Sequence, residues 1–183
     1  MDFFEVVDER RSIRSFKEGS LCDETVEKII SAGMKAPSAG NMQPWEFIIV
    51  KDSEIKKRIT KETYLGYMKK EGKPQNWMMQ AQVFIVCCVN YVQTMSRYGE
   101  FGKHVALLDV AASIENMLLA TTALGLASCW VSGFRTEGIK EILNLPDNIE
   151  PVAVLPIGIP EKKPASPPKF DLEYIVHYEK YNG

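Results

Sequence analysis

The sequence predicts a fold of the α+β or α/β class, in which helices pack on a mostly antiparallel or mixed sheet. Three observations predict it. The 183 residues are 45% apolar and 25% charged, which is ordinary for a globular chain and unlike a disordered one. The length fits about one domain and can bury a large core without disulfides or metals. Helical and strand-like patterns are interspersed without an internal repeat, so we expect one domain over residues 1–183.

In the first third of the chain the pattern predicts three helices, a loop and a strand. Apolar residues recur at helical spacing after Asp23, a candidate N-cap, and the helix should end before Pro37. Ser53 is the candidate cap of the third helix. The expected elements are a helix from 3 to about 11, a helix from 24 to about 35, a loop over 37–44, a strand over 45–50 and a polar helix from 54 to about 63.

The middle of the chain contains the most apolar segments. Residues 64–77 mix glycine, lysine, proline and aromatic residues, and we expect an irregular excursion that could serve as a lid. Residues 82–89 predict a buried strand. A long helix from 104 to about 124 is apolar over most of its circumference and must be covered on every side. In a chain this short, we expect a second subunit to supply part of that cover.

The last third predicts two more strands, a short helix and an extended arm. The strands are expected over 127–131 and 151–157, with the helix over about 136–143. Residues 161–168 are proline-rich and should be extended, and residues 170–181 are again apolar. An arm over residues 160–183 that cannot fold on itself is expected to lie on another surface, most simply that of a partner subunit.

Charge and motif content argue against several function classes. The formal net charge of −2 provides no global positive field for nucleic acid or an anionic membrane. The acidic N-terminus lacks the apolar region of a signal peptide, and polar residues interrupt the uncharged stretch 116–134 that could be mistaken for a membrane helix. No GxSxG, HExxH, P-loop or GxGxxG motif is present. If the protein is an enzyme, we therefore expect a cofactor to supply the chemistry.

The cysteines and histidines predict no metal site. The four cysteines form no CxxC pair, and Cys87-Cys88 lie in an apolar run where buried, inert thiols are expected. The two histidines, His104 and His177, pair with no carboxylate or cysteine pattern of metal-ligand spacing. This cysteine usage indicates a reducing cytoplasm.

The first candidate binding segment covers residues 10–17. It places four cations and two hydroxyls in eight residues with no carboxylate between them. Arginine forks and hydroxyls suit a phosphate dianion, which accepts several charge-assisted hydrogen bonds at once. The alternative is a solvated helix end whose cations face the negative pole of the helix dipole.

Two further segments could approach a flat ligand. In the loop 37–44, prolines stiffen the backbone, small residues admit a close approach, and the amides of Asn41 and Gln43 could pair with a heterocycle edge. In the segment 125–134, a strand that ends in Ser132-Gly133 exposes backbone N–H groups. Taken alone, each could equally be an ordinary connection between elements.

In this order and at these intervals, the segments resemble the nitroreductase family of flavin mononucleotide (FMN)-dependent oxidoreductases. The resemblance rests on RRSIRSF, APSAGNMQPWEFIIV, DVAASIENMLLATTALGLASCWVSGF, PVAVLPIGIPEKKP and the ending IVHYEKY, and it is weakest between residues 51 and 80. It implies an α+β fold with a central mixed, mostly antiparallel sheet flanked by helices. It also implies a homodimer with an exchanged C-terminal arm and two FMN sites at the subunit interface.

The resemblance implies roles for three groups of residues. Those carried over are Arg10, Arg11, Ser12 and Arg14 for the FMN phosphate and ribityl end, Pro37, Ser38, Ala39 and Asn41 of the other subunit for the isoalloxazine ring, and Val131, Ser132 and Gly133 for the flavin N5 edge. Many members carry a tail arginine as a second phosphate ligand. Here the nearest basic residue is Lys169, which offers a point charge instead of a fork. Either Gln75 or Asn76 is near the position of an amide that reaches the pyrimidine side.

The resemblance implies a two-electron transfer, as hydride, from NADH or NADPH to an electron-poor acceptor such as a nitroaromatic or a quinone. The two half-reactions would alternate at one site in a ping-pong cycle, with no catalytic side chain, because the chemistry takes place at flavin N5. The alternatives are other chemistry on the same fold, such as reductive dehalogenation or ring dehydrogenation, and a non-catalytic flavin-binding redox module. The sequence does not choose between NADH and NADPH, although Lys69, Lys70 and Lys73 could attract a 2′-phosphate.

Overall fold

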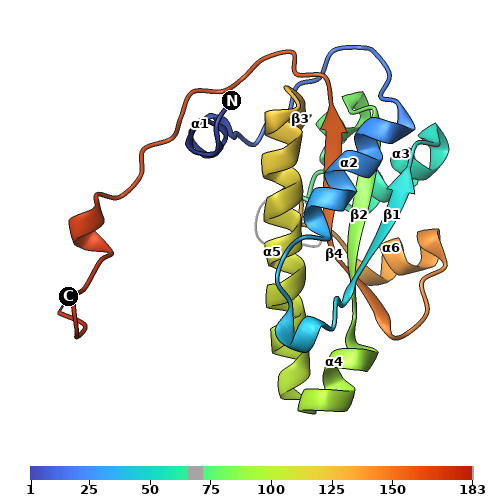
Figure 1. The fold of residues 1–183 in the computed structure, drawn as a ribbon. Helices are drawn as coiled ribbons and strands as arrows, with labels where there is room; N and C mark the ends of the chain where they lie inside the picture. Colours follow the sequence, from blue (N-terminus) through green and yellow to red (C-terminus); the bar gives the residue numbers. More distant parts are fainter. Residues whose placement is uncertain (66–71, 183) are drawn as a thin grey trace.

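The computed structural model describes residues 1–65 and 72–182, and its centre is a four-stranded sheet (Figure 1). The strands are β1 (Trp45–Val50), β2 (Val83–Asn90), β3 (Ala127–Ser128) and β4 (Ile149–Gly158). They lie in the order β1-β2-β4-β3, and every paired neighbour is antiparallel. One parallel bridge, between Ser12 and Ser128, joins the N-terminal segment to this sheet. The class is α+β, as the resemblance implied.

Helices cover both faces of the sheet (Figure 1). The helices are α1 (Phe3–Glu9), α2 (Asp23–Gly33), α3 (Ser53–Glu62), α4 (Tyr91–Tyr98), α5 (Phe101–Ala123) and α6 (Thr136–Leu143), with short 3₁₀ turns η1 (Ala39–Asn41), η2 (Asn76–Gln80) and η3 (Leu172–Tyr174). Alternate residues of β2 point to opposite faces. Ile85 and Cys87 pack with α2 and α5, whereas Phe84 and Val86 pack with α3 and α6.

The expected elements are mostly confirmed, with corrections at their ends. Ser53 is not the cap of α3, because Asp52 Oδ1 accepts the hydrogen bond from the Ile55 amide at 2.8 Å. Asp23 is the first residue of α2 and not its cap; the N-cap is Cys22, whose side chain makes no capping bond. The strand expected over 127–131 is only two residues long, and Val131 forms an isolated bridge with Val154.

The helix α4 was not predicted. Its residues follow directly on β2, and the Asn90 side chain accepts a hydrogen bond from the Val92 amide at its start. Polar and apolar residues are mixed over its eight positions, so helical periodicity alone is weak. The helix ends at Gly99, and α5 begins two residues later, three residues before the expected start.

By length and composition alone, α5 is apolar enough to cross a membrane. Its contacts indicate a core helix instead, because Val110, Ile114 and Met117 are fully buried against α2 and the sheet. Another part of its surface is open, since Phe101 and Leu108 are exposed. Part of this apolar helix is therefore left uncovered by its own chain, and the expected cover by a second subunit stays a prediction.

Beyond β4 the chain leaves the body of the protein as an extended arm (Figure 1). Its first residues are held, because Lys17 N donates to Ile159 O at 2.9 Å and Glu161 N donates to Ser15 O at 3.1 Å. An ion pair between Lys163 and Glu9 adds to this anchor. From Pro164 onward the arm is almost entirely exposed, as its proline content predicts.

Candidate functional site

The segment 10–14 is fixed by its neighbours on both sides. The chain leaves α1 at Arg10 and runs beside β3, where Ile13 N donates to Ser128 O at 2.9 Å. Ile13 and Phe16 point into the core, and Arg14 between them is exposed. The Arg14 side chain is therefore directed away from the core.

A cavity of about 550 Å³ opens over this segment. Its lining includes every residue expected at the phosphate end, together with Lys169 from the arm; the principal lining residues are Arg10, Arg11, Ser12, Arg14, Pro164, Pro167 and Lys169. The arm crosses the cavity after its anchor at Glu161, so the chain itself brings Lys169 to the arginines.

The three arginines differ in their partners. Arg10 Nε lies 3.4 Å from Glu115 Oε1 of α5. Arg11 Nη1 donates to Asp8 O at 2.6 Å and Arg10 O at 2.8 Å, so it satisfies carbonyls at the end of α1. Arg14 lies over the Trp77 ring, with Cζ 5.8 Å from its centroid, and it has no carboxylate partner in the described part of the chain.

An unused N–H group and a local positive charge lie beside the cavity. Arg11 Nε is buried and has no partner among the described residues. Below the segment, burial raises the pKa of the Cys129 thiol, whereas the charges of Arg14 and Arg10 and a hydrogen bond with Ser12 lower it. A concentrated positive charge with an unused N–H group suits an anion that accepts several hydrogen bonds.

The turn 37–43 has an unusual backbone. Gly40, Asn41 and Gln43 adopt φ values of 57°, 57° and 49°, in the left-handed region. Ala39 N donates to Asp109 Oδ2 of α5 at 3.1 Å, and Gln43 N donates to Ser38 Oγ at 3.0 Å. Glycine and asparagine tolerate this region, whereas glutamine is strained there. The backbone N–H of Gln43 thus supports the loop from within.

Within one chain, this turn and the cationic cavity are separate. Their contacts on α5, Asp109 and Glu115, stand six residues apart, about 9 Å along the axis and about 120° around it. Figure 1 shows α1 beside the upper part of α5 and the turn near its lower part. The four expected ring-lining residues, Pro37, Ser38, Ala39 and Asn41, are absent from the described lining of the cavity. In a site shared between two subunits, one subunit would supply the cavity and the other would supply the turn.

The segment 131–133 leaves β3 and crosses β4. Val131 and Val154 exchange two backbone hydrogen bonds of 3.0 and 2.9 Å. Gly133 O accepts from Tyr64 N at 2.8 Å, and a Cβ on Gly133 would lie 2.8 Å from Tyr64 O. The backbone at Tyr64 therefore leaves no room for a side chain at position 133, and glycine is required there. In the described structure the amides of Ser132 and Gly133 donate no hydrogen bond, so they are available to an acceptor.

The expected excursion 64–77 is described only in part. Lys69 and Lys70 lie outside the described residues, as does the centre of the expected lid. The Gln75 side chain is buried and donates to Tyr64 O at 3.2 Å, whereas Asn76 is exposed at the start of η2. Of the two amides that could reach a ligand, Asn76 has the free side chain.

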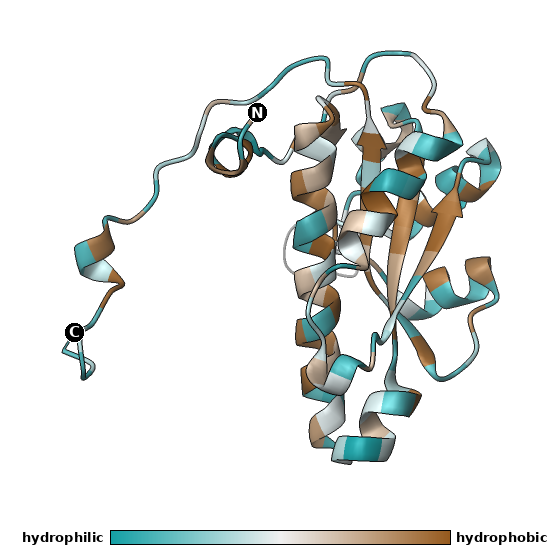
Figure 2. Cartoon of the chain, viewed as in Figure 1, coloured by the Kyte–Doolittle hydropathy of each residue, from teal (hydrophilic) through white to brown (hydrophobic). Residues whose placement is uncertain are grey.

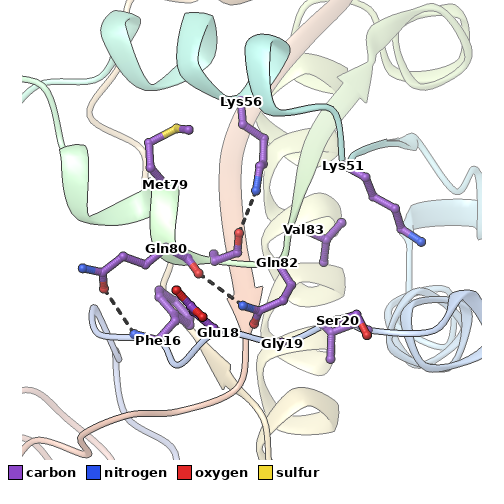
Figure 3. Close-up of a pocket in the computed structure, with 12 residues that line it drawn as sticks. Phe16, Glu18, Gly19, Ser20, Lys51, Lys56, Met79, Gln80, Gln82 and Val83 are labelled. Carbon is purple, nitrogen blue, oxygen red and sulfur yellow. Dashed lines mark hydrogen bonds between the residues drawn. The ribbon is translucent and has the colours of Figure 1, made fainter.

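A second cavity, also about 550 Å³, lies between the loop 16–21, α3 and the start of β2 (Figure 3). Two of its polar side chains, Gln82 and Lys56, are already paired with backbone. Gln82 Oε1 accepts from Ile159 N at 2.8 Å, Gln82 Nε2 donates to Lys17 O at 2.9 Å, and Lys56 Nζ donates to Ala81 O at 2.8 Å. Burial lowers the pKa of Lys56. These contacts join the loop to the sheet and leave few groups for a ligand.

The described residues contain no group of three or more histidine, cysteine, aspartate or glutamate side chains that could hold a metal ion. The cysteines are free; Cys22 is exposed and the other three are buried. For Cys87 and Cys88, burial raises the pKa of both thiols, to about 12 in the case of Cys88. The predicted burial of both thiols is confirmed, and their inertness stays a prediction.

Comparison with known proteins adds the family. The model of the nitroreductase family matches residues 7–159. A protein of Methanothermobacter thermautotrophicus named "Putative NADH dehydrogenase/NAD(P)H nitroreductase" is 30% identical over 99% of this chain and 88% of its own. An "FMN reductase (NADPH)" of Bacillus subtilis is 26% identical over 97% of this chain and 74% of its own.

A solved structure extends the comparison to the fold. A nitroreductase family protein of Clostridium difficile superposes with a TM-score of 0.83 at 30% identity, covering 99% of this chain and 100% of its own. The antiparallel sheet and its flanking helices thus agree with the match along the sequence. This chain belongs to the nitroreductase family.

Proposed function

We propose that this protein is an NAD(P)H-dependent FMN oxidoreductase that transfers two electrons, as hydride, to an electron-poor acceptor such as a nitroaromatic or a quinone. The observation that carries the proposal is the cavity in which Arg10, Ser12 and Arg14 meet Lys169. The family and the printed names of the relatives support the activity. The two half-reactions alternate at one site, which gives ping-pong kinetics.

The cavity fits the phosphate end of FMN. Arg14 lacks a carboxylate partner in the described structure, and the buried Arg11 Nε has an unused N–H. The Ser12 hydroxyl and the Lys169 ammonium, which also line the cavity, add two more hydrogen-bond donors. Because Lys169 supplies a point charge and Arg14 a planar fork, Arg14 contributes the larger share of orientation.

At the other end, the chain supplies shape and hydrogen bonds. Bound FMN supplies the redox chemistry, with hydride arriving from NADH or NADPH and two electrons leaving to the acceptor. Pro37, Ser38, Ala39 and Asn41 of the partner subunit line the ring, and the unpaired amides of Ser132 and Gly133 face its N5 edge. These residues orient the reactants and stabilise developing charge, and no side chain acts as a nucleophile.

The proposed site requires a homodimer. Apolar residues are exposed on α1, on part of α5 and along the arm, as Figure 2 shows in brown. The most exposed large ones include Phe4 at 76%, Phe170 at 80% and Tyr178 at 83%. An apolar surface of this extent marks an interface. The arm beyond Lys169 lies on the partner, and the four free thiols favour a reducing cytoplasm.

The phosphate assignment is tested by comparing FMN with riboflavin, which lacks the phosphate. Arg14→Ala should weaken FMN binding by about tenfold or more, because a charge-assisted hydrogen bond is lost, and should leave riboflavin binding unchanged. The control is Arg58→Ala, which removes an exposed arginine of α3 away from the cavity. Dissociation constants come from quenching of flavin fluorescence. Equal FMN affinity in the Arg14→Ala variant and the wild type would contradict the assignment.

The activity is tested on the purified protein. Anaerobic addition of NADH or NADPH should bleach the flavin absorbance, and a later addition of a nitroaromatic or quinone should restore it. A protein that binds FMN but is not reduced by either nucleotide would be a binding module and not an oxidoreductase of this kind.

A further inference from the structure

The turn 37–43 holds a backbone that its own sequence does not favour. Two residues without the freedom of glycine, Asn41 and Gln43, have φ values of 57° and 49°, and Gly40 between Ala39 and Asn41 has 57°. A left-handed φ strains both residues, asparagine less than glutamine. A conformation of this kind persists only where surrounding contacts determine it.

One of those contacts comes from a distant element. The Asp109 carboxylate, on α5, accepts the hydrogen bond from Ala39 N at 3.1 Å. Two further side-chain hydrogen bonds, from Gln43 N to Ser38 Oγ and from Gln43 Nε2 to Asn41 O, lie within the turn and move with it. Asp109 is therefore the side chain that ties the turn to the rigid helix.

The position of Asp109 in α5 is otherwise unfavourable for a carboxylate. It is the one acidic side chain that is buried in the described structure, at 9% exposure, on a helix that is apolar over most of its surface. Burial raises its pKa, opposed only by the hydrogen bond from Ala39. An apolar residue would pack there without this cost, so the carboxylate is explained by its role as an acceptor.

Side chains at the end of α4 pack against Gly40 of the segment 37–43. A Cβ on Gly40 would lie 2.3 Å from Nη1 of Arg97 and 3.1 Å from the Tyr98 hydroxyl. The φ of 57° is what favours glycine at position 40, because the Arg97 guanidinium is the end of a flexible side chain that could move aside. The turn is confined between α4 and α5, with Asp109 as its one hydrogen-bonded attachment to α5.

We propose that Asp109 is a positioning residue for the flavin ring: by accepting the Ala39 N–H, it fixes the turn whose residues line the ring in the partner's site. This inference rests on the proposed function, because it takes the ring-lining role of Ser38, Ala39 and Asn41 from there. It adds a side chain that does not touch the flavin but sets the shape of the surface that does.

The experiment separates the ring from the phosphate. Asp109→Ala removes the acceptor, and Asp109→Asn keeps an oxygen acceptor of the same shape without the charge. The control is Asp52→Ala, which deletes another carboxylate that accepts a backbone N–H, at the start of α3. Dissociation constants for FMN and for riboflavin are measured by fluorescence quenching, and exchange of the amides in 37–43 is followed by hydrogen–deuterium exchange on the flavin-free protein.

Asp109→Ala should weaken FMN and riboflavin by the same factor, about tenfold, because the loss is on the ring side. The same variant should speed amide exchange in 37–43. Asp109→Asn should lie within about twofold of the wild type for both flavins, and Asp52→Ala should not change either affinity. The equal loss for both flavins and the rescue by asparagine distinguish positioning from a general loss of stability.

Unchanged flavin affinity and amide exchange in Asp109→Ala would overturn the inference, while leaving the proposed function in place. Equal weakening by Asp52→Ala at the same loss of stability would also overturn it. If the wild-type dimer bound neither flavin, the proposed function itself would fail and the ring-positioning role with it, whatever the exchange data showed.

Discussion

The strand β2 and the C-terminal arm are both rich in apolar residues, yet they have opposite environments. Residues Val83 to Val89 of β2 are at most 1% exposed, between two layers of helices. In the arm, Phe170 is 80% exposed and Leu172 is 74% exposed. The apolar area of β2 is buried by its own chain, whereas that of the arm is left for another molecule.

This difference indicates that burial within one chain stabilises the fold, whereas the proposed site depends on contacts with a second copy. Burial of apolar surface is worth about 25 cal/mol per Å², but only where a partner surface exists. The core of one chain is complete without the arm. In the proposed dimer a second copy covers the arm, and Lys169 is the last arm residue that lines the cavity of its own chain.

Thiol reactivity gives the largest expected contrast between the buried strand and the surface. Because the pKa of the Cys88 thiol is raised from 9.0 to about 12, its thiolate fraction near neutral pH is about a thousandfold below that of an ordinary cysteine. A thiol reagent should label Cys22 alone in the native protein and all four cysteines after denaturation. Rapid native labelling of Cys87 or Cys88 would show that the core opens readily.

Truncating a phenylalanine in each region sharpens the comparison. Phe84, in β2, is fully buried on the face of the sheet that α3 and α6 cover. Phe84→Ala should therefore lower the free energy of unfolding by about 3–5 kcal/mol. Urea denaturation followed by circular dichroism measures the loss. A loss below about 1 kcal/mol would mean that the core on this face is looser than its burial indicates.

The matched change in the arm is Phe170→Ala. It should leave the secondary structure intact and weaken the dimer by about 1–2 kcal/mol, as expected for an aromatic side chain at an interface. Sedimentation at several protein concentrations measures the dimer dissociation constant. An unchanged dissociation constant would show that Phe170 is not covered by the partner.

The smallest expected effect concerns Lys56, whose ammonium is buried above Phe84. Burial lowers its pKa below the ordinary 10.5, so the unfolded chain binds more protons than the folded one in that range. Wild-type stability should therefore rise, relative to Lys56→Met, as the pH is raised from neutral toward 10.5. Parallel urea titrations at several pH values measure the trend, and a falling difference would contradict a buried ammonium.

Local pattern predicted the regular elements well. Helical spacing located α2 and α6, and β-branched and aromatic runs located β1, β2 and β4, because these signals depend on neighbouring residues. The cap of α3 was misplaced by one residue, since Asp52 and Ser53 are both good caps and only the geometry of the Ile55 amide distinguishes them. The helix α4 was missed because its periodicity is weak over eight residues.

The candidate site was predictable as a set of segments but not as an arrangement. The sequence drew attention to Arg14, Lys169 and the turn 37–43. It did not reveal that Arg11 is engaged with the end of α1, or that Asp109 supports Ala39. Those contacts join residues far apart in the chain, and no local pattern specifies them.

By itself, then, the sequence determined which segments become helices and strands, which residues are apolar enough for a core or an interface, and which motifs resemble a known family. Tertiary structure alone decided which arginine bonds backbone carbonyls and which faces the cavity, that Lys169 lines the same cavity, and which acid of α5 ties down the strained turn. Side-chain chemistry and periodicity are properties of short stretches of chain, whereas these contacts exist only once the sheet and helices have packed.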